Sequence, residues 1–368
     1  MGGASTAVAD DGTALWTNPA GLARDERLDI EVFGGALASN RNDFTAALDR
    51  LSSLDLDRIL QGQDLSRIPG AIRDLRTLAL PGTGVVGSGI AGLVVGKGGV
   101  AIGIGDMVYG GVFPTVDLTR ILPGNDPATG LAFNQTGLTF LGLEAREARI
   151  AYATGFLKKA ILVGGTARYI QGRTYFLRRG VFDTGESDPA DLLREAFEEN
   201  ARETSKFAFD AGAMVNLLGK VRIGLVTTAV NEPEFDVASV AGAPRTVKLP
   251  RTLRAGVAVQ PIGMLTLAAD YDLEETETLL LQEGDDPAKS RQLSAGVELK
   301  LPLIAIRAGA LRDSAAPDPH WAYSAGFGLG LKMLSVNAAV LFSSEGGLSL
   351  SSTNRRDIGA ALDARFRF

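Results

Sequence analysis

Apolar and polar residues alternate over much of this chain. Between positions 358 and 368 every even position is apolar, while the odd positions include Asp363, Arg365 and Arg367. The same period of two recurs near residues 206–217, 253–260, 265–274, 292–301 and 321–332. Such a period is typical of antiparallel strands with one apolar and one polar face. The pattern therefore predicts an all-β protein.

The lengths of the connections between these strands distinguish an outer-membrane barrel from a soluble sandwich. About fourteen strands start near positions 27, 82, 100, 138, 160, 205, 221, 249, 264, 291, 303, 321, 334 and 356. Very short gaps between strands, such as 97–99 and 157–159, alternate with long ones, such as 41–81 and 117–136. Short turns on one side, long loops on the other and an even strand number are the layout of outer-membrane barrels, whereas a soluble sandwich has no reason to sort its connections. We expect residues 27–368 to form a transmembrane antiparallel β-barrel, with extracellular loops and both chain ends on the periplasmic side.

Two of the long loops carry helical patterns. Residues 189–203 follow a capping Asp188, begin with a proline in the first turn and continue as an amphipathic run. Leucines at helical spacing recur through residues 42–79. Short helices are therefore expected in both loops, where they either cap the loop or form a lid over a ligand.

Composition removes several classes of function. The 368 residues include no Cys and one His, which excludes disulfide frameworks, thiolate metal sites, cysteine nucleophiles and sites that need two imidazoles. With 37 Lys and Arg against 43 Asp and Glu, no basic excess marks a nucleic-acid surface.

The glycine motif at 82–87 precedes a strand instead of the helix that a dinucleotide site needs. His320 is expected to be a loop residue, and the acidic clusters at 274–277 and 285–286 lack calcium-loop spacing. No enzymatic activity, metal or cofactor is expected.

The polar face of the last seven predicted strands is charged. The residues concerned are Arg254, Asp270, Asp272, Glu298, Lys300, Arg307, Lys332, Asp363, Arg365 and Arg367. Inward charges form either a solvated channel wall or a paired network that closes the barrel, and mixed signs on neighbouring strands favour the network.

Glycine is unusually frequent, with 45 residues, and much of it falls on the predicted strands. Inward glycines such as Gly212, Gly256 and Gly296 would let a segment inside the lumen approach the wall. A sideways opening to lipid would need a strand kink, for which the glycine pairs at 110–111 and 164–165 are candidates.

Residues 1–26 do not alternate. A run of small residues ends in two adjacent acids and is followed by a Trp and an Asn-Pro turn. This polar, glycine-rich segment is predicted to fold into the lumen as a plug. The residues expected to hold the plug or contact a substrate are Gly2, Gly3, Asp10, Asp11, Trp16, Asn18, Pro19 and Ala20.

The N-terminal segment carries the clearest resemblance to known proteins. Its GGA, its acidic pair and its NPA about eight residues later resemble the signature shared by FadL-type channels, PorV-type secretion proteins and barrel-type conjugal-transfer TraF proteins. The stretches LGLEAREARIAYA, GGTARYIQGRTYF and LAADYDL are most similar to the TraF group, so the resemblance covers nearly the whole chain. The thioredoxin-like proteins that share the TraF name are excluded because this chain has no Cys.

The resemblance implies two alternative functions. A FadL-type channel takes up small hydrophobic or amphipathic molecules by passive diffusion past a plug. A TraF-like or PorV-like protein is an outer-membrane assembly or interaction protein that does not transport, and its extracellular loops would bind a protein partner. Both readings imply a Gram-negative outer membrane with its lipopolysaccharide as surroundings. Export is expected although the first residues lack the basic and apolar regions of a signal peptide.

Overall fold

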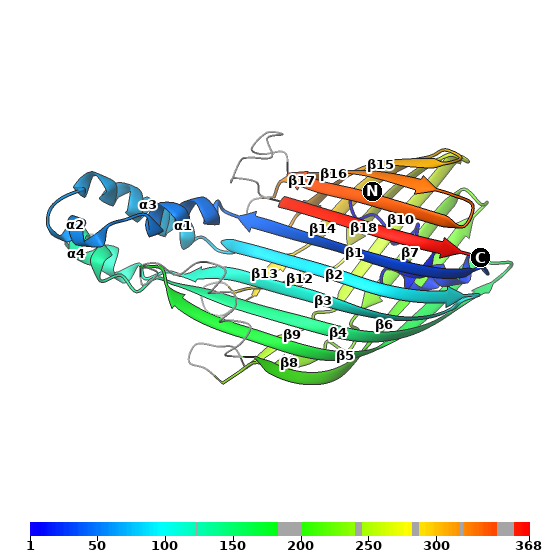
Figure 1. The fold of residues 1–368 in the computed structure, drawn as a ribbon, viewed down its shortest axis with the longest axis horizontal. Helices are drawn as coiled ribbons and strands as arrows, with labels where there is room; N and C mark the ends of the chain where they lie inside the picture. Colours follow the sequence, from blue (N-terminus) through cyan, green and yellow to red (C-terminus); the bar gives the residue numbers. More distant parts are fainter. Residues whose placement is uncertain (123, 183–200, 240–244, 282–286, 317–318, 344–356) are drawn as a thin grey trace.

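Fourteen strands of the described chain close into one antiparallel barrel (Figure 1). The structure is a computed structural model that describes all residues except 123, 183–200, 240–244, 282–286, 317–318 and 344–356. The barrel strands are β1 (Leu28–Arg41), β2 (Gly84–Lys97), β3 (Val100–Thr115), β4 (Gly137–Phe156), β5 (Ile161–Gly180), β6 (Arg202–Leu217), β7 (Val221–Thr228), β10 (Thr252–Ile262), β11 (Leu265–Asp272), β14 (Gln292–Lys300), β15 (Ile304–Asp313), β16 (Trp321–Gly330), β17 (Leu334–Ser343) and β18 (Asp357–Arg367). Strand β1 pairs with β18 to close the barrel. The predicted fold class is confirmed, and each predicted strand start lies within three residues of an observed one.

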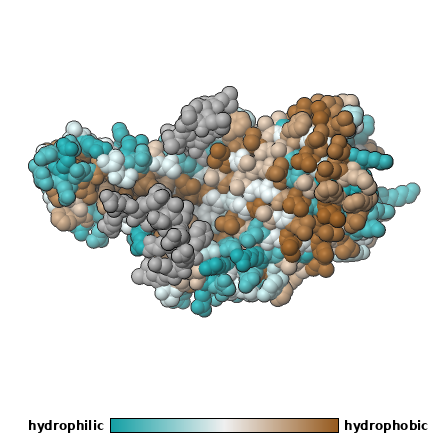
Figure 2. Space-filling view, in the orientation of Figure 1, coloured by the Kyte–Doolittle hydropathy of each residue, from teal (hydrophilic) through white to brown (hydrophobic). Residues whose placement is uncertain are grey.

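The alternation seen in the sequence separates the two faces of the wall. On β18, the apolar side chains Ile358, Leu362 and Phe366 are about half exposed on the outside, whereas Arg365 and Arg367 form ion pairs inside. Large exposed apolar residues follow the same rule on other strands and form a hydrophobic band around the molecule (Figure 2). Such a band is what a barrel presents to lipid.

The two ends of the barrel differ. At one end, here called the turn end, short connections such as 98–99 and 157–160 join the strands. The long connections gather at the opposite loop end, together with the helices (Figure 1).

The strand kinks considered at the two glycine pairs are not observed. Strand β3 keeps an unbroken register with both neighbours through Gly110 and Gly111. Strand β5 does the same through Gly164 and Gly165. In the described barrel ladder the register shift lies elsewhere, between Val259 and Ile262 of β10 near the turn end.

The insertion between β1 and β2 is helical and has a small core of its own. It contains α1 (Phe44–Ser52), α2 (Leu56–Leu60), η3 (Leu65–Arg67) and α3 (Ile68–Leu78), and packs with η4 (Thr119–Ile121) and α4 (Pro127–Ala132). This helical module projects from the loop end (Figure 1). The helix predicted at 189–203 falls mostly outside the described residues. Among the residues that are described, the structure contains no helix with the length and apolar character needed to span a bilayer.

Two short hairpins pair within themselves and not with the barrel. They are β8–β9 (Glu234–Asp236 and Thr246–Lys248) and β12–β13 (Thr276–Leu281 and Pro287–Ser290). Phe235 of β8 is fully buried against Gly172 of β5, beside the inward-facing Leu143 and Ile170. Strand β12 reaches across to β2 and β3 on the far wall. Both hairpins therefore turn into the lumen, although the sequence shows these regions only as long loops.

Candidate functional site

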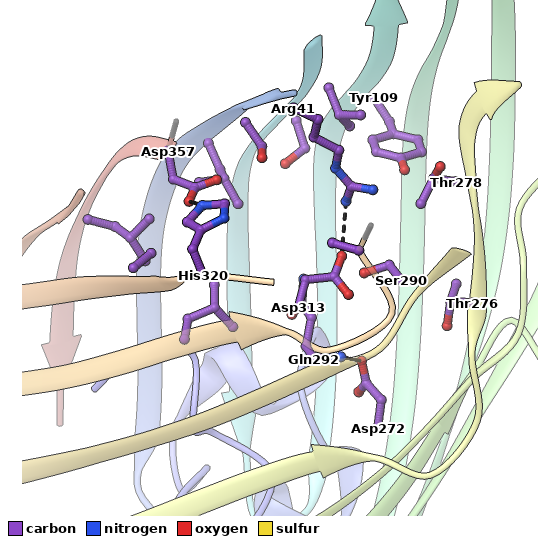
Figure 3. Close-up of a pocket in the computed structure, with 18 of the residues that line it drawn as sticks. Arg41, Tyr109, Asp272, Thr276, Thr278, Ser290, Gln292, Asp313, His320 and Asp357 are labelled. Atoms are coloured by element: carbon purple, nitrogen blue, oxygen red, sulfur yellow. Dashed lines mark hydrogen bonds and ion pairs between the residues drawn. The ribbon is translucent and has the colours of Figure 1, made fainter. Parts of the chain in front are cut away.

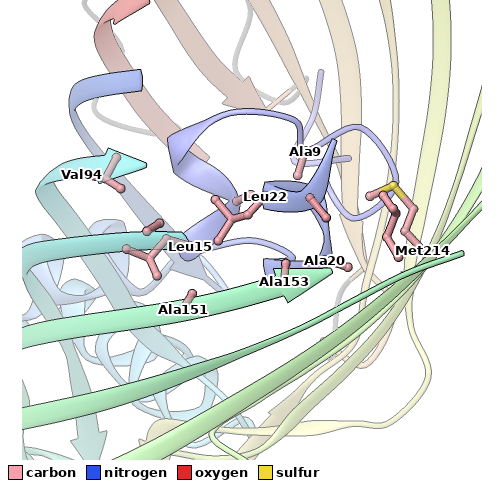
Figure 4. Packing of buried hydrophobic residues seen from close by; sticks show 12 residues of the cluster. Ala9, Leu15, Ala20, Leu22, Val94, Ala151, Ala153 and Met214 are labelled. Carbon is pink, nitrogen blue, oxygen red and sulfur yellow. The ribbon is translucent and has the colours of Figure 1, made fainter. Parts of the chain in front are cut away.

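The first 23 residues lie inside the barrel and are held by its inner wall. The carboxylate of Asp270 on β11 accepts hydrogen bonds from the backbone N–H groups of Ser5 and Thr6, each at 2.8 Å. Arg222 on β7 donates to the carbonyl oxygen of Ala7 at 2.9 Å. Residues 9–23 pack their apolar side chains, Leu15 and Leu22 among them, against inward residues of β2 to β6 (Figure 4). The division into a separate plug and barrel stays a prediction.

Glycines make this close packing possible. A Cβ on Gly164 would lie 2.6 Å from the backbone carbon of Pro19, and a Cβ on Gly224 would lie 2.5 Å from the carbonyl oxygen of Thr6. These distances are shorter than any normal contact, so the N-terminal segment can lie here only because the wall has no side chain at these positions. The inward glycines proposed from the sequence, Gly212, Gly256 and Gly296, likewise face Asn18, Thr6 and Met1.

The substitution Gly164→Val is expected to lift the Pro19 turn off the wall, because overpacking in a filled interior costs roughly 1–3 kcal/mol. Hydrogen exchange of the backbone amides of residues 18 and 20–23 should then become faster. Gly165→Val is the matched control, because a Cβ on this lipid-facing neighbour meets nothing closer than 3.6 Å. Equal exchange in both variants would contradict the packing described here.

Two predicted residues cap the short helices of the segment. Asp11 caps η1 (Gly12–Leu15) by accepting from the N–H of Thr13, and it pairs with Arg365 at 2.7 Å. Burial and the neighbouring Asp10 raise the pKa of Asp11. Asn18 caps η2 (Pro19–Ala23) and donates to the carbonyl oxygen of Thr6 at 2.8 Å.

The remaining predicted residues of the segment fall into different environments. Trp16 packs over the inner backbone of β3 at Gly103 and makes an edge contact with Phe33, with ring centroids 4.8 Å apart. Pro19 and Ala20 are buried, and Gly2 lies against the backbone of Ala310. Gly3 is exposed, and the Asp10 side chain is half exposed beside Arg24 at 3.3 Å.

Most of the predicted charged wall is paired. Arg254 and Asp272 lie 2.6 Å apart, as do Arg307 and Glu298, and Arg367 and Asp29. Asp363 accepts from Asn337, which itself accepts from Arg307, and Asp270 binds the N-terminal segment as described. Lys300 and Lys332 lie differently: both are exposed at the turn end, and Lys332 belongs to the turn between β16 and β17.

A buried charge cluster on β4 to β6 is missing from the predicted set. Glu147 accepts from Arg149 and Arg168, with ion-pair distances of 2.5 Å to each. Asp210 lies 3.3 Å from Arg168 and also accepts from the N–H of Ala229. All four side chains, here called the buried quartet, are at most 5 % exposed. Arg149 also lies 4.9 Å above the Trp16 ring, so the quartet touches the N-terminal segment.

Between the N-terminal segment and the loop end lies a cavity of about 250 Å³, here called the loop-end cavity (Figure 3). Leu37, Val86, Leu311 and Leu341 supply apolar wall. Hydroxyl and amide groups from the β12–β13 hairpin and β14 face them, together with the carboxylate of Glu277. The cavity is therefore amphipathic, and residues of the barrel and of the inward hairpin line it.

Three charged pairs of the described residues border the loop-end cavity, and Arg254 with Asp272, described above, is one of them. Arg41 pairs with Asp313 at 2.9 Å through one terminal nitrogen, while its other terminal nitrogen is buried and has no partner among the described residues. His320 lies 2.5 Å from Asp357 (Figure 3). The sequence predicts only a loop residue at His320, and alternation gives no signal for its role because it precedes β16. Within the described part of the chain, no three acidic or imidazole side chains converge as metal ligands would.

These features define a β-barrel of the outer-membrane class whose lumen holds the chain's own N-terminal segment and two inward hairpins. The chain belongs to the family described as "F plasmid transfer operon, TraF, protein", whose sequence model matches residues 15–272. A search among curated proteins found no match.

Solved structures with a similar fold include channels and transporters. The Ralstonia pickettii toluene transporter TbuX aligns with 100 % of this chain and 96 % of its own, at a TM-score of 0.55 and 13 % identity. The P. putida toluene transporter TodX aligns with 100 % of this chain and 97 % of its own, at a TM-score of 0.54 and 14 % identity. A Pseudomonas aeruginosa FadL homologue aligns with 99 % of this chain and 95 % of its own, at a TM-score of 0.51 and 13 % identity. At these identities the likeness establishes the fold.

Proposed function

We propose that this protein is an outer-membrane channel of the FadL type in a Gram-negative cell, and that it admits a small amphipathic molecule from the loop end. The observation that carries the proposal is the loop-end cavity, which is lined by the barrel wall and the inward β12–β13 hairpin. Ligand sites are typically concave and apolar, with a few polar groups that fix orientation. The leucines and the unpartnered nitrogen of Arg41 supply both kinds of contact.

The size of the cavity limits the substrate. An apolar cavity of roughly 150 Å³ holds one benzene molecule, so about 250 Å³ suits a single ring with a small substituent. Two of the similar structures are toluene transporters by name. The polar wall and the Arg41 nitrogen favour a ring that carries an oxygen over a bare hydrocarbon. A long acyl chain exceeds this volume.

Filling the cavity tests the proposal. The variant Leu341→Trp is expected to lower uptake of a radiolabelled cresol into proteoliposomes by about tenfold, because the indole occupies the space that the ring needs. Val340→Trp is the matched control, because Val340 is the next residue on β17 and is 52 % exposed on the lipid face. If wild-type vesicles take up cresol no faster than protein-free vesicles, the channel proposal fails.

The helical module favours a second candidate, binding of another protein. Helices α1 and α3 bury Phe44, Leu51 and Leu75 in a core that continues onto the loop ends of β2, β3 and β4. Leu60, Leu65 and Phe133 are about half exposed. A folded module that extends beyond the barrel (Figure 1) is placed to meet a partner outside the cell. Replacing residues 43–80 by a short Gly-Ser linker should abolish partner binding and leave cresol uptake unchanged.

A further inference from the structure

The outside of the barrel carries two arginines that lack acidic partners. Arg312 lies on β15, between the inward residues Leu311 and Asp313, and therefore points outward. Arg291 immediately precedes β14, and its guanidinium lies 5.8 Å from the ring of the outward-facing Tyr271. Neither arginine has an ion-pair partner within the described residues, and the Nε atom of each is buried without a hydrogen-bond acceptor.

The two arginines are close neighbours. Arg312 pairs in register with Leu293 across β14 and β15. Arg291 lies two positions before Leu293 on the same face, so the two arginines are diagonal neighbours, about 7–8 Å apart. Two flexible side chains at this separation can converge on one anion.

Aromatic rings indicate where the two arginines lie along the barrel axis. Arg312 lies 5.8 Å from the ring of Trp321 on β16, in the same kind of contact that Arg291 makes with Tyr271. Towards the turn end the outward faces become apolar, with Leu267, Ile306 and Phe327 all more than 40 % exposed. Tyr and Trp at the edge of an apolar band mark the boundary between hydrocarbon and headgroups.

We propose that Arg291 and Arg312 form a binding site for the phosphate of a phosphorylated outer-leaflet lipid, with Tyr271 and Trp321 packing against its first acyl carbons. Guanidinium groups bind phosphate through paired, charge-assisted hydrogen bonds. Arg291 donates through one terminal nitrogen to the carbonyl oxygen of Leu273 at 3.3 Å, and among the described residues neither guanidinium has an acidic acceptor. The two guanidinium groups therefore keep donors for a phosphate, and the apolar surface below the pair receives the acyl chains. A lipid supplies both parts, whereas a free phosphate or an acidic peptide leaves the apolar surface uncovered.

A neighbouring arginine provides a matched control. Arg251 precedes β10 at the same end of the barrel, but its guanidinium is already paired with Glu274 at 2.7 Å. It therefore has less capacity to bind an added phosphate.

The test uses native mass spectrometry of the full-length protein in detergent with bisphosphorylated lipid A as the probe. The double variant Arg291→Gln and Arg312→Gln is expected to weaken lipid A binding on the order of tenfold to thirtyfold, while Arg251→Gln binds like the wild type. Heat-modifiable gel mobility establishes that each variant is folded. Unchanged binding by a folded double variant overturns the proposal.

Two measurements on the wild-type protein do not depend on the variants. Lipid A stripped of both phosphates should bind more weakly by a similar factor, and equal binding overturns the proposal. Inorganic phosphate at the same concentration as lipid A should not displace it, and complete displacement would assign the site to free phosphate instead. Cresol uptake has no part in either readout, so failure of the channel proposal leaves this test intact.

Discussion

Deletion of residues 2–23 is expected to convert the barrel into an open aqueous pore. This segment fills the turn end of the lumen, where it packs against glycines of the wall and is bound by Asp270 and Arg222. Without it, the loop-end cavity would connect directly to the turn end. Barrels of eight strands are filled by their own side chains, whereas those of sixteen or more leave a channel, so an emptied barrel of fourteen should conduct.

Planar-bilayer recordings measure this effect. Single-channel conductance should rise on the order of tenfold above that of the full-length protein. The control replaces the helical module, residues 43–80, by a Gly-Ser linker, and should keep the low conductance because that module lies outside the barrel (Figure 1). A folded deletion variant with unchanged conductance means that the hairpins, and not the N-terminal segment, form the barrier.

The second large effect is expected at the buried quartet. In Glu147→Leu, the guanidinium groups of Arg149 and Arg168 lose the carboxylate that lies between them and remain buried. Removing one partner of a buried ion network costs about 3–5 kcal/mol, because the remaining charges are left uncompensated. Urea unfolding in lipid vesicles, followed by tryptophan fluorescence, should show this loss, and Trp16 reports directly because it lies over Arg149.

An exposed pair provides the comparison for this variant. Asp106 lies 3.6 Å from Arg146 on the outer surface, with side chains 46 % and 61 % exposed. Asp106→Leu should cost no more than about 1 kcal/mol, as is usual for exposed pairs. If Glu147→Leu is no more destabilising than Asp106→Leu, the quartet does not contribute to stability in the way its burial indicates.

The barrel could be predicted from the sequence because lipid imposes a simple pattern. On β18 every outward position is apolar, whereas inward positions accept charges, and the length of each connection records the side on which it lies. The capping role of Asn18 could also be anticipated, since an Asn before Pro at the start of a helical turn has a local signature.

The buried quartet could not be predicted from the sequence, for a physical reason. On β4 the outward positions also carry charge, with Glu144 and Arg146 paired to each other outside, next to Glu147 and Arg149 inside. The contrast between the two faces disappears there, so alternation cannot assign them. The alternation rule fails at Lys300 for another reason. Lys300 is the last residue of β14, so its side chain reaches water at the turn end whether its position is inward or outward.

The inward hairpins could not be predicted because their strands are short, with three residues each in β8 and β9, six in β12 and four in β13. Such short runs give little alternation, and only the burial of Phe235 and Val247 against β5 and β4 reveals that the first hairpin folds inward. The loop-end cavity depends on the second hairpin.

Within the described residues, the β12–β13 hairpin pairs with itself and forms no ladder with a barrel strand. The lining of the lumen at the loop end therefore does not depend on the hydrogen bonding that holds the wall together. Replacement of residues 276–290 would alter the chemistry of the cavity while leaving Arg291 and the strand registers of the barrel in place, so a designer could graft new recognition loops onto the same frame.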